Sequence, residues 1–352
     1  MNRKPEKGVV AVSGGVDSAV AAHLLREQGY DVVGVHFTFD LGDGCSAVGS
    51  EEDARRSAEA LGIELRVVST TEAMKPIIDY FVAEYARGRT PNPCPVCNAT
   101  VKFARLLALA DDLSADFVAT GHHARVVREG DAPALYRARY RAKDQSYALF
   151  ALPREFLHRV VLPVGELASK QEVREIARSL ELPVHDKPES QDICFLAAGD
   201  YTELLAARSP RALHEGNIVN SAGEVLGRHA GVGRYTIGQR RGLGIAAAEP
   251  LYVTALDAET ATVTVGPKSE VFSASLTASH ANWHCDPPDE FAAVVKVRYN
   301  HEGAPARVRL LGDGRFEVRF DEPVAAVTPG QAAVCYDGDR LLGGGWIDPS
   351  ER

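Results

Sequence analysis

The sequence predicts an α/β protein in which a parallel sheet domain is followed by a small central domain and a C-terminal antiparallel β-barrel. Up to about residue 190, short apolar runs alternate with helical stretches, which is typical of a parallel sheet with helices on both faces. After about Tyr201 the pattern changes to Gly/Arg-rich turns, and from Ser273 onward only strand-like runs remain. We therefore expect domain boundaries that give residues 1–200, 201–272 and 273–352.

In the first domain, compact β-branched runs predict strands and Ala/Leu-rich stretches predict helices. The expected strands are Val9–Val12, Val32–Phe37, Leu65–Val68 and Phe117–Thr120. The expected helices are Ala19–Gln28, Glu51–Leu61, about Met74–Arg87 and Ala99–Leu113. Gly29 and Gly62 should end the first two helices, and Asn98 should cap the fourth. Ligands are expected at the carboxyl ends of the strands.

The second half reads as a short helix followed by strands. The helix is expected over Tyr201–Ala207, and a hairpin over Leu251–Leu256 and Ala261–Val265. Turn signals such as Gly312-Asp313-Gly314 separate the later runs and suggest a small barrel. These later strands are Ala292–Tyr299, Ala306–Leu311, Arg315–Phe320, Gln331–Tyr336 and Arg340–Ile347.

Composition excludes several classes of protein. Of 352 residues, 45% are hydrophobic and 25% charged, which is ordinary globular usage and excludes general disorder. No apolar run approaches the ~18–20 residues that a membrane helix needs. The apolar run that follows the basic N-terminal residues is too short for a signal peptide. We expect a soluble, cytoplasmic protein without a membrane partner. The net charge of −9 argues against nonspecific coating of nucleic acid but permits a local basic groove.

A glycine-rich loop follows the first strand. Its sequence is Ser13-Gly14-Gly15-Val16-Asp17-Ser18. The glycines let the backbone present N–H groups at a helix N-terminus, the serines can donate to phosphate, and Asp17 can hold Mg²⁺. The chain has neither a Walker motif nor a dinucleotide fingerprint here. The segment resembles the signature of the PP-loop ATP pyrophosphatases, which cleave ATP between the α and β phosphates and adenylate a substrate oxygen. A strand-to-helix turn without a ligand is the alternative.

The six cysteines are too few for a disulfide scaffold. Cys94 and Cys97 form a Cys-x-x-Cys pair, which in a reducing compartment suggests metal or redox chemistry. Prolines stiffen the extended loop Thr90–Asn98, and Cys97 should lie at the entrance of the helix capped by Asn98, where the dipole favours thiolate. Small loop residues without chemistry are the alternative, and Cys194 alone would be a core cysteine. No chemical role is expected for Cys45, Cys285 and Cys335.

Two stretches are locally basic. Residues Tyr136–Lys143 alternate strictly, so a strand would present four like charges on one face and favour an anionic partner. The four are Arg137, Arg139, Arg141 and Lys143. Val225–Ala248 has no acidic residue, and its Tyr235 could stack on a base. Its cations are Arg228, Arg234, Arg240 and Arg241. Confined basic stretches on an acidic protein suit a specific RNA footprint; a solvated strand face is the alternative.

Together these segments resemble the bacterial tRNA-specific 2-thiouridylase family over nearly the whole chain. The pieces that carry the resemblance are Ser13–Ser18, Ala86–Pro93, Cys97-Asn98, Ala119–His122, Lys143–Tyr147, Ile193–Phe195, Tyr235–Gly244, Val297–Tyr299 and Phe320–Gln331. The resemblance implies a PP-loop domain, a central domain and a C-terminal β-barrel. It also implies ATP and Mg²⁺ as cofactors, tRNAs for Lys, Glu and Gln as substrates, and a persulfide donor such as a cysteine desulfurase or sulfur-relay protein.

The resemblance also implies roles for individual residues. Cys97 would be the nucleophile and Cys194 the persulfide carrier, with Cys94 beside the target base. The expected ATP-binding residues are Ala11, Val12, Ser13, Gly14, Gly15, Val16, Asp17, Ser18, Phe37 and Gly121. The expected tRNA contacts are Asn92, Pro93, Cys94, His122, Lys143, Asp144, Gln145, Arg298, Tyr299 and Gln331. Phe37 stands where the family often has Met.

Cys94 is a departure, because many members have Asp at that position and that Asp has been assigned acid/base duty. A thiol transfers protons with a different pKa, about 8.5 against about 3.9. The substitution also gives three thiols, Cys94, Cys97 and Cys194, which could ligate a [4Fe–4S] cluster with one open iron. Persulfide and cluster chemistry both stay open, with persulfide favoured.

The resemblance therefore implies a tRNA-uridine 2-sulfurtransferase. The wobble uridine O2 would attack the α-phosphorus of ATP, and sulfur from Cys194 would replace the adenylated oxygen, leaving a Cys97–Cys194 disulfide. A mobile segment around Ser190–Phe195 would bring the two cysteines together. One rival is a PP-loop small-molecule synthetase, which leaves the cysteines and the barrel unexplained. Another is a non-catalytic RNA-binding or iron–sulfur module, against which intact Asp17 and Ser18 count.

Overall fold

The structure is a computed structural model that describes residues 5–42, 50–130, 132–182, 184–185, 193–196 and 200–349. Cys45 and the Ser190–Asp192 part of the expected mobile segment lie outside the described residues. The chain divides into two compact units. The first comprises the described residues of Met1–Lys75, Cys94–Gly199 and Gly338–Leu342, and the second those of Pro76–Pro93, Asp200–Asp337 and Gly343–Arg352.

The first unit contains a five-stranded parallel sheet of order β3-β2-β1-β4-β7. Its strands, with a separate antiparallel hairpin of β5 and β6, are β1 (Lys7–Ala11), β2 (Asp31–Thr38), β3 (Glu64–Ser69), β4 (Phe117–Ala119), β5 (Ala124–Glu129), β6 (Ala132–Arg137) and β7 (Val160–Val161). The expected α/β fold class is confirmed, with each of the four expected strands found within two residues of its predicted ends.

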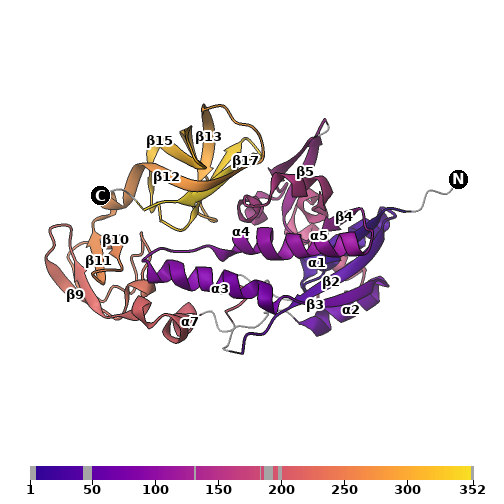
Figure 1. Cartoon of the computed structure of the whole chain (residues 1–352), viewed down its shortest axis with the longest axis horizontal. Coiled ribbons are helices and arrows are strands. Elements are labelled where there is room, and N and C mark those ends of the chain that lie inside the picture. Colours follow the sequence, from indigo (N-terminus) through magenta and orange to yellow (C-terminus); the bar gives the residue numbers. More distant parts are fainter. Residues whose placement is uncertain are drawn as a thin grey trace. The chain divides into compact units, whose positions relative to one another are not determined.

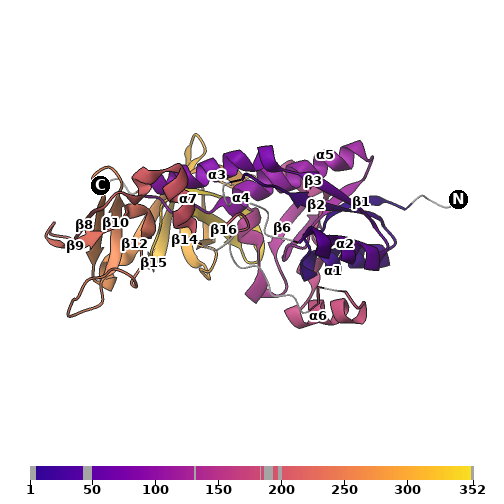
Figure 2. The same ribbon diagram turned by 90° about the horizontal axis from the view of Figure 1, so that it is seen from below.

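Helices cover both faces of this sheet. α1 and α2 pack on one face and α5 on the other (Figures 1 and 2). The helices are α1 (Val16–Glu27), α2 (Glu51–Leu61), α4 (Pro93–Cys97), the π-helix η1 (Asn98–Phe103), α5 (Ala104–Asp112) and α6 (Lys170–Ser179). A further helix, α3 (Thr71–Ala86), belongs to the second unit from Pro76 onward. Short 3₁₀ helices are η2 (Arg141–Lys143), η3 (Ser146–Leu149), η4 (Arg154–Arg159) and η5 (Pro163–Glu166).

Local signals explain why α2 has the predicted bounds. The Ser50 side chain accepts a hydrogen bond from the Asp53 N–H at 3.0 Å and caps the helix, and three acidic residues occupy its first turn. Gly62 ends it in the left-handed conformation, with φ of 60°, where a glycine carries no Cβ penalty.

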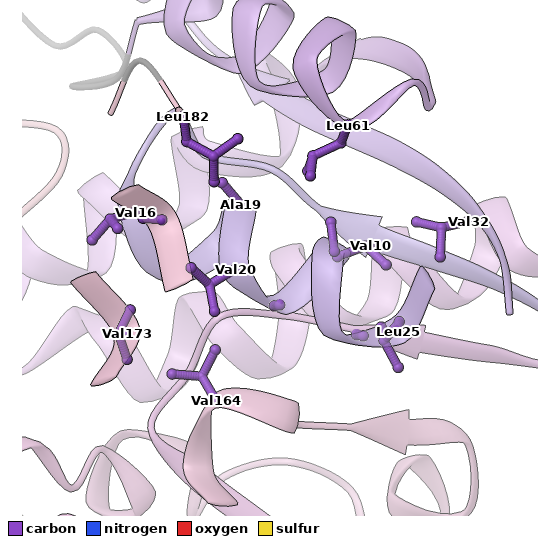
Figure 3. Packing of buried hydrophobic residues seen from close by; sticks show 14 of the residues in the cluster. Val10, Val16, Ala19, Val20, Leu25, Val32, Leu61, Val164, Val173 and Leu182 are labelled. Carbon is purple, nitrogen blue, oxygen red and sulfur yellow. The ribbon is translucent and has the colours of Figure 1, made fainter. Parts of the chain in front are cut away.

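The core of the first unit lies between α1, the sheet and α6. Val10 and Val32 come from the sheet, while Ala19, Val20 and Leu25 come from different sides of α1 and are fully buried (Figure 3). Val164, Val173 and Leu182 close the other side of α1 (Figure 3). Because α1 is buried between two layers, its N-terminus, and the loop that precedes it, is held rigidly at the carboxyl end of β1.

The second unit contains a mixed four-stranded sheet of order β10-β11-β8-β9 and a ring of antiparallel strands. The ring runs β12-β15-β14-β13-β16-β17 and closes by pairing of β12 with β17. The elements are α7 (Tyr201–Arg208), η6 (Pro210–Leu213), β8 (Gly216–Val219), β9 (Val225–His229), η7 (Val232–Arg234), β10 (Tyr252–Asp257), β11 (Thr262–Gly266), η8 (Lys268–Val271), β12 (Phe272–Trp283), β13 (Glu290–Lys296), β14 (Ala304–Gly312), β15 (Arg315–Ala325), β16 (Ala332–Asp337) and β17 (Arg340–Ile347).

The predicted helix after Tyr201, the hairpin and the closed barrel are confirmed. The sequence reading missed β12, β8 and β9, as well as the β5–β6 hairpin. The domain boundaries expected at residues 200 and 272 stay a prediction. None of the helices in the described residues is long and apolar enough to cross a membrane.

Candidate active site

The loop between β1 and α1 is shaped to receive an anion. Gly14 has φ of 76°, and a Cβ there would lie 2.7 Å from the Ser50 carbonyl oxygen. Gly15 occupies the N-cap of α1 in an extended conformation, and no side chain caps the helix. Because the N-cap residue has no side chain, it makes no cap bond to the first N–H groups of α1, and the helix dipole adds positive potential there.

Two serines brace this loop. The Ser18 hydroxyl accepts a hydrogen bond from the Ser13 N–H at 3.0 Å and donates one to the Gly15 carbonyl at 2.9 Å. The Ser13 hydroxyl lies 3.1 Å from the Ser18 hydroxyl. Because both residues come from the predicted motif and bond to each other, the loop is held in its shape by its own side chains.

Asp17 is bonded to two basic residues that the sequence reading missed. The Lys170 ammonium at the start of α6 lies 2.6 Å and 2.8 Å from the two Asp17 carboxylate oxygens. The His123 Nε2 lies 3.0 Å from Oδ1. Although burial acts in the opposite direction, these two partners lower the pKa of Asp17 from its ordinary value. Asp17 is therefore an ionised carboxylate that holds Lys170 beside the loop.

Gly121 packs directly against the loop. A Cβ at this residue would lie 2.6 Å from both the carbonyl carbon of Asp17 and the Ser18 nitrogen. The glycine follows β4, the strand beside β1, so the close approach of the two segments requires the absence of a side chain.

One cavity of about 310 Å³ joins this loop to two of the cysteines. Its lining includes Ser13, Asp17, Cys97, Cys194 and Gln145. The wall between them is largely apolar. It is formed by Ala11, Val12, Val35, Phe37, Phe39, Met74 and Val101, with polar groups from Ser18, His36, Thr70, Lys102, Thr120, Gly121 and His122. All of these residues belong to the first unit.

The structure corrects the prediction about the helix that carries Cys97. Helical structure begins at Pro93 and continues through the π-helix into α5, so Asn98 lies inside it and is no cap. The Asn98 side-chain N–H donates to the Ala148 carbonyl at 2.9 Å instead. The expectation failed because proline is tolerated in the first turn of a helix, where its missing N–H needs no partner.

Cys97 consequently lacks the helix-terminus environment that the sequence suggested. Its side chain is buried, with 6% exposure, and its thiol contacts the Met74 sulfur at 3.8 Å. Burial raises the pKa of Cys97 to about 11, although the charge of Lys102 acts in the opposite direction. Cys94 is exposed and Cys194 half-buried. In the described residues no group of three or more His, Cys, Asp or Glu side chains could hold a metal ion, so the three cysteines do not fit a cluster in this arrangement.

His122 lines the same cavity. Its Nδ1 lies 2.7 Å from the Thr120 hydroxyl, and its ring lies 5.9 Å from that of Phe103 between centroids. Burial, with the nearby Lys102 charge, lowers the pKa of His122 to about 3, so the imidazole is neutral at physiological pH. Gln145 lines the cavity too, and its Oε1 accepts the His123 N–H at 2.9 Å.

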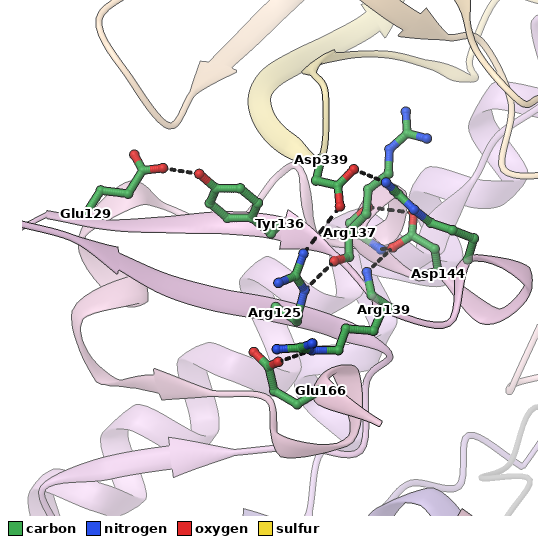
Figure 4. Close-up of polar contacts among 11 residues, drawn as sticks. Arg125, Glu129, Tyr136, Arg137, Arg139, Asp144, Glu166 and Asp339 are labelled. Atoms are coloured by element: carbon green, nitrogen blue, oxygen red, sulfur yellow. Dashed lines mark hydrogen bonds and ion pairs between the residues drawn. The ribbon is translucent and has the colours of Figure 1, made fainter. Parts of the chain in front are cut away.

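The predicted basic strand Tyr136–Lys143 is wrong. β6 ends at Arg137, and Arg141–Lys143 forms η2. Figure 4 shows Arg139 paired with Glu166, at 2.6 Å, and Asp339 facing Arg125. Arg141 also pairs with Asp339. No row of like charges forms because the strand ends at Arg137. In addition, acidic residues distant in sequence pair with Arg139 and Arg141.

Asp144 has a folding role. It is buried, and its carboxylate accepts hydrogen bonds from the Ala138 N–H at 3.0 Å, from the Ser146 N–H at 3.2 Å and from the Ser146 hydroxyl at 2.9 Å. These bonds hold the turn that connects β6 to η3 (Figure 4). Lys143 is partly exposed beside it.

The remaining predicted tRNA contacts belong to the second unit. Arg298 donates to the Ile237 carbonyl at 2.6 Å and to the Thr328 hydroxyl, Gln331 donates to the Thr90 carbonyl at 2.8 Å, and Tyr299 is 40% exposed. Asn92 is half-buried and Pro93 begins α4.

Tyr235 does not present its ring to a base. It is buried among the residues between η7 and the β8–β11 sheet, and it meets His229 edge-on at 5.5 Å. Local pattern does not predict this burial, because the strands that cover Tyr235 lie on both sides of it in the chain.

The basic residues at the site that were not predicted include Lys102, His123 and Lys170. The partners of His123 and Lys170 lie 106 and 153 residues away along the chain, so no local pattern marks them. Lys102 follows Cys97 by five residues, a spacing that places the two on one face only where the helix is wider than an α-helix.

Comparison with known proteins agrees with this geometry. The family described as "tRNA methyl transferase HUP domain" matches residues 6–198, a "tRNA methyl transferase PRC-barrel domain" matches residues 203–267, and an "Aminomethyltransferase beta-barrel domain" matches residues 273–347.

Curated relatives match the chain over almost its whole length. The "tRNA-specific 2-thiouridylase MnmA" of Syntrophotalea carbinolica is 49% identical over 353 residues, covering 99% of this chain and 100% of that protein. The protein of the same name from Carboxydothermus hydrogenoformans is 46% identical, covering 97% and 98%. Among solved structures, the likeness to the U34-tRNA thiolase NcsA from Methanococcus maripaludis is weak, with a TM-score of 0.35, 21% identity and coverage of 58% of this chain and 69% of that one. The chain belongs to the tRNA-specific 2-thiouridylase (MnmA) family.

Proposed function

We propose that the protein uses ATP to replace the C2 oxygen of the wobble uridine of tRNA with sulfur. The observation that carries the proposal is the continuous cavity that joins the phosphate loop to Cys97 and Cys194. An enzyme that activates a substrate oxygen and then delivers sulfur to the same carbon needs both groups in one space. The names of its relatives give the substrate class, and the tRNAs for Lys, Glu and Gln are the expected acceptors.

ATP binds with its phosphates on the Ser13–Ser18 loop. The N–H groups at the start of α1 bind the anionic phosphates, and the Ser13 hydroxyl can donate to them. The Ser18 hydroxyl can donate to a phosphate only by exchanging its hydrogen bond to the Gly15 carbonyl. Phe37, Val35 and Phe39 give the cavity an apolar wall on which adenine can pack. The expected contribution of Gly121 is space, because it lets β4 approach the loop closely.

Mg²⁺ would enter with ATP. It commonly binds through one or two carboxylates together with substrate phosphates, and Asp17 is the carboxylate at this loop. When bound, the metal neutralises phosphate charge as pyrophosphate leaves. Lys170, which Asp17 holds at 2.6 Å, is a second cation available to the same phosphates.

The chemistry begins with attack of the uridine O2 on the α-phosphorus of ATP. The bond to pyrophosphate breaks, and the adenylated C2 becomes electrophilic because its oxygen is now part of a good leaving group. The cavity wall excludes water from this intermediate. Exposed Cys94 is the expected proton-transfer group beside the base.

Sulfur reaches the base through two cysteines. A donor protein, such as a cysteine desulfurase or a sulfur-relay protein, transfers a sulfur atom to Cys194 as a persulfide. The Cys97 thiolate attacks the inner sulfur, forming the Cys97–Cys194 disulfide and releasing hydrosulfide. Hydrosulfide attacks C2, AMP leaves with the original oxygen, and a proton is lost from the new thiocarbonyl. A dithiol reductant then supplies two electrons to restore both thiols.

The arrangement of the cysteines favours the persulfide route over an iron–sulfur cluster. The relay needs two cysteines, and Cys97 and Cys194 line one cavity. A cluster needs three ligands held together, and the described residues offer no such group.

The tRNA itself would be bound by Asn92, Pro93, Cys94, His122, Lys143, Gln145, Arg298, Tyr299 and Gln331, with Asp144 shaping the segment between Lys143 and Gln145.

A thiolation assay tests the proposal. Unmodified tRNA is incubated with Mg-ATP, a persulfide donor and enzyme, then digested and its nucleosides examined by mass spectrometry. We expect 2-thiouridine from wild type and from the control Cys285→Ser, and none from Cys97→Ser or Cys194→Ser. Formation of AMP and pyrophosphate without any thiolated nucleoside would refute the proposal and favour a PP-loop synthetase. Activity that requires added iron and is lost in Cys94→Ser would replace the relay with a cluster.

A further inference from the structure

The π-helix η1 changes which residue lies beside Cys97. In an α-helix, residue i+5 lies about 140° around the axis from residue i. The hydrogen bonds of a π-helix join residues five apart, so residue i+5 lies on the same face as residue i. The π-helix Asn98–Phe103 begins directly after Cys97, and this widening brings Lys102 onto the face that carries the Cys97 thiol.

The cavity shows the result of this register. Cys97, Val101 and Lys102 all line it, together with Cys194 from a separate segment. Lys102 is half-buried, and within the described part of the chain no carboxylate forms an ion pair with it. The titratable groups that act on its charge are Cys94, Cys97 and Cys194, while His122, which also feels that charge, is neutral.

We infer that Lys102 is the positioning residue of the sulfur transfer, whose ammonium stabilises the Cys97 thiolate and the hydrosulfide that it releases. The inference rests on the proposed function. The step is Cys97–S⁻ plus Cys194–S–SH giving Cys97–S–S–Cys194 plus HS⁻. One S–S bond forms, one breaks, and a single negative charge moves from Cys97 to the leaving sulfur. A cation that lines the same cavity as both cysteines can balance that charge throughout the step.

The environment of Cys97 explains why a cation is needed. Burial alone disfavours the thiolate, and the Lys102 charge is the influence that acts to lower the pKa of Cys97. Removal of the Lys102 charge should therefore leave Cys97 as a buried thiol. Among the described residues, no other nearby positive group acts to lower its pKa.

Alkylation measures this coupling without tRNA, ATP or donor. In a Cys94→Ser background, which leaves Cys97 as the only cysteine of its peptide, the rate of iodoacetamide modification of Cys97 is followed by mass spectrometry between pH 7 and 10. We expect Lys102→Met to lower the rate about three- to tenfold at pH 8, because a higher pKa reduces the thiolate fraction more than it raises nucleophilicity. Lys102→Arg should restore most of the rate, and the exposed control Lys268→Met should match the parent.

A rate for folded Lys102→Met that equals or exceeds that of the parent would overturn the inference. Should that variant fail to fold, as judged by its thermal transition, Lys102→Gln provides the same comparison with a polar end group. Single-turnover thiolation by enzyme preloaded with a Cys194 persulfide tests the proposed function and the role of Lys102 separately. In the parent with Cys94 intact, absence of 2-thiouridine refutes the proposed function. If the parent thiolates and Lys102→Met thiolates equally fast, only the role of Lys102 fails.

Discussion

Gly121 limits the size of the side chain that can face the phosphate loop. In Gly121→Ala, the new Cβ would meet the Asp17 and Ser18 backbone at 2.6 Å, so the loop must move. We expect at least a tenfold loss of ATP affinity, measured by calorimetry, and a destabilisation of about 1–3 kcal/mol. Gly227→Ala is the matched control, because its Cβ would meet only Ile245 at 3.6 Å. Equal ATP affinity for both variants would show that the loop does not depend on this contact.

The imidazole of His122 makes stability depend on pH. Its folded pKa, about 3, lies below its unfolded value of about 6.5, so the unfolded chain binds a proton that the folded chain does not. The contribution is complete above pH 6.5 and is lost as the pH falls towards 3. Between pH 7.5 and 5, wild type should lose about 2 kcal/mol more than His122→Gln in urea unfolding. The exposed control His214→Gln should behave as wild type does. A loss of equal size in His122→Gln would contradict the buried, neutral state.

At the scale of elements, Asn98 distinguishes a helix interior from a helix cap. Asp is as good a cap as Asn, but it cannot donate the hydrogen bond that Asn98 makes to the Ala148 carbonyl. We expect Asn98→Asp to destabilise the protein by at least about 2 kcal/mol, because it buries a charge and loses a donor. At the true N-cap of α7, where Asp200 accepts the Thr202 N–H at 2.8 Å, Asp200→Asn should change stability by less than about 0.5 kcal/mol. Chemical denaturation of both variants makes the comparison.

The same elements show what sequence can and cannot reveal. The bounds of α2 were predictable because Ser50 and Gly62 act within the helix itself. The phosphate loop was predictable because its glycines and serines are contiguous. The start of α4 was not, since Pro93 and Pro95 look like loop residues and are equally compatible with a first helical turn. Lys102 was hidden, because a spacing of five has meaning only in a π-helix.

Distance along the chain sets the other limit on prediction. The alternating pattern predicts that Arg139 and Arg141 belong to an anion-binding row, but Glu166 and Asp339 pair with them. Lys170 reaches Asp17 from 153 residues away. Long-range ion pairs follow from how the elements pack, so neither the neutralised arginines nor the recruited lysine could be read from local pattern.

At the scale of the whole molecule, the net charge of −9 leads us to expect that tRNA binding depends on a few cations without acidic partners. Arg240 and Arg241 are exposed, and in the part of the chain that the structure describes neither forms an ion pair. By contrast, Arg139 and Arg141 have acidic partners. Counterion release makes affinity fall with salt in proportion to the phosphates contacted.

The double variant Arg240→Ala/Arg241→Ala should therefore weaken tRNA binding and reduce the slope of log affinity against log salt by about 1.4–1.8, the value for two phosphate contacts. Arg139→Ala/Arg141→Ala removes the same formal charge but also frees Glu166 and Asp339, and should leave the slope nearly unchanged. Filter binding from 50 to 300 mM salt measures both. Should the two double variants have the same slope, affinity would follow net charge alone, and the exposed arginines would not form a specific footprint. A slope reduced only in Arg240→Ala/Arg241→Ala would mean that the protein, whose net charge repels RNA, binds it through specific arginines. These are the arginines that have no acidic partner in the described residues.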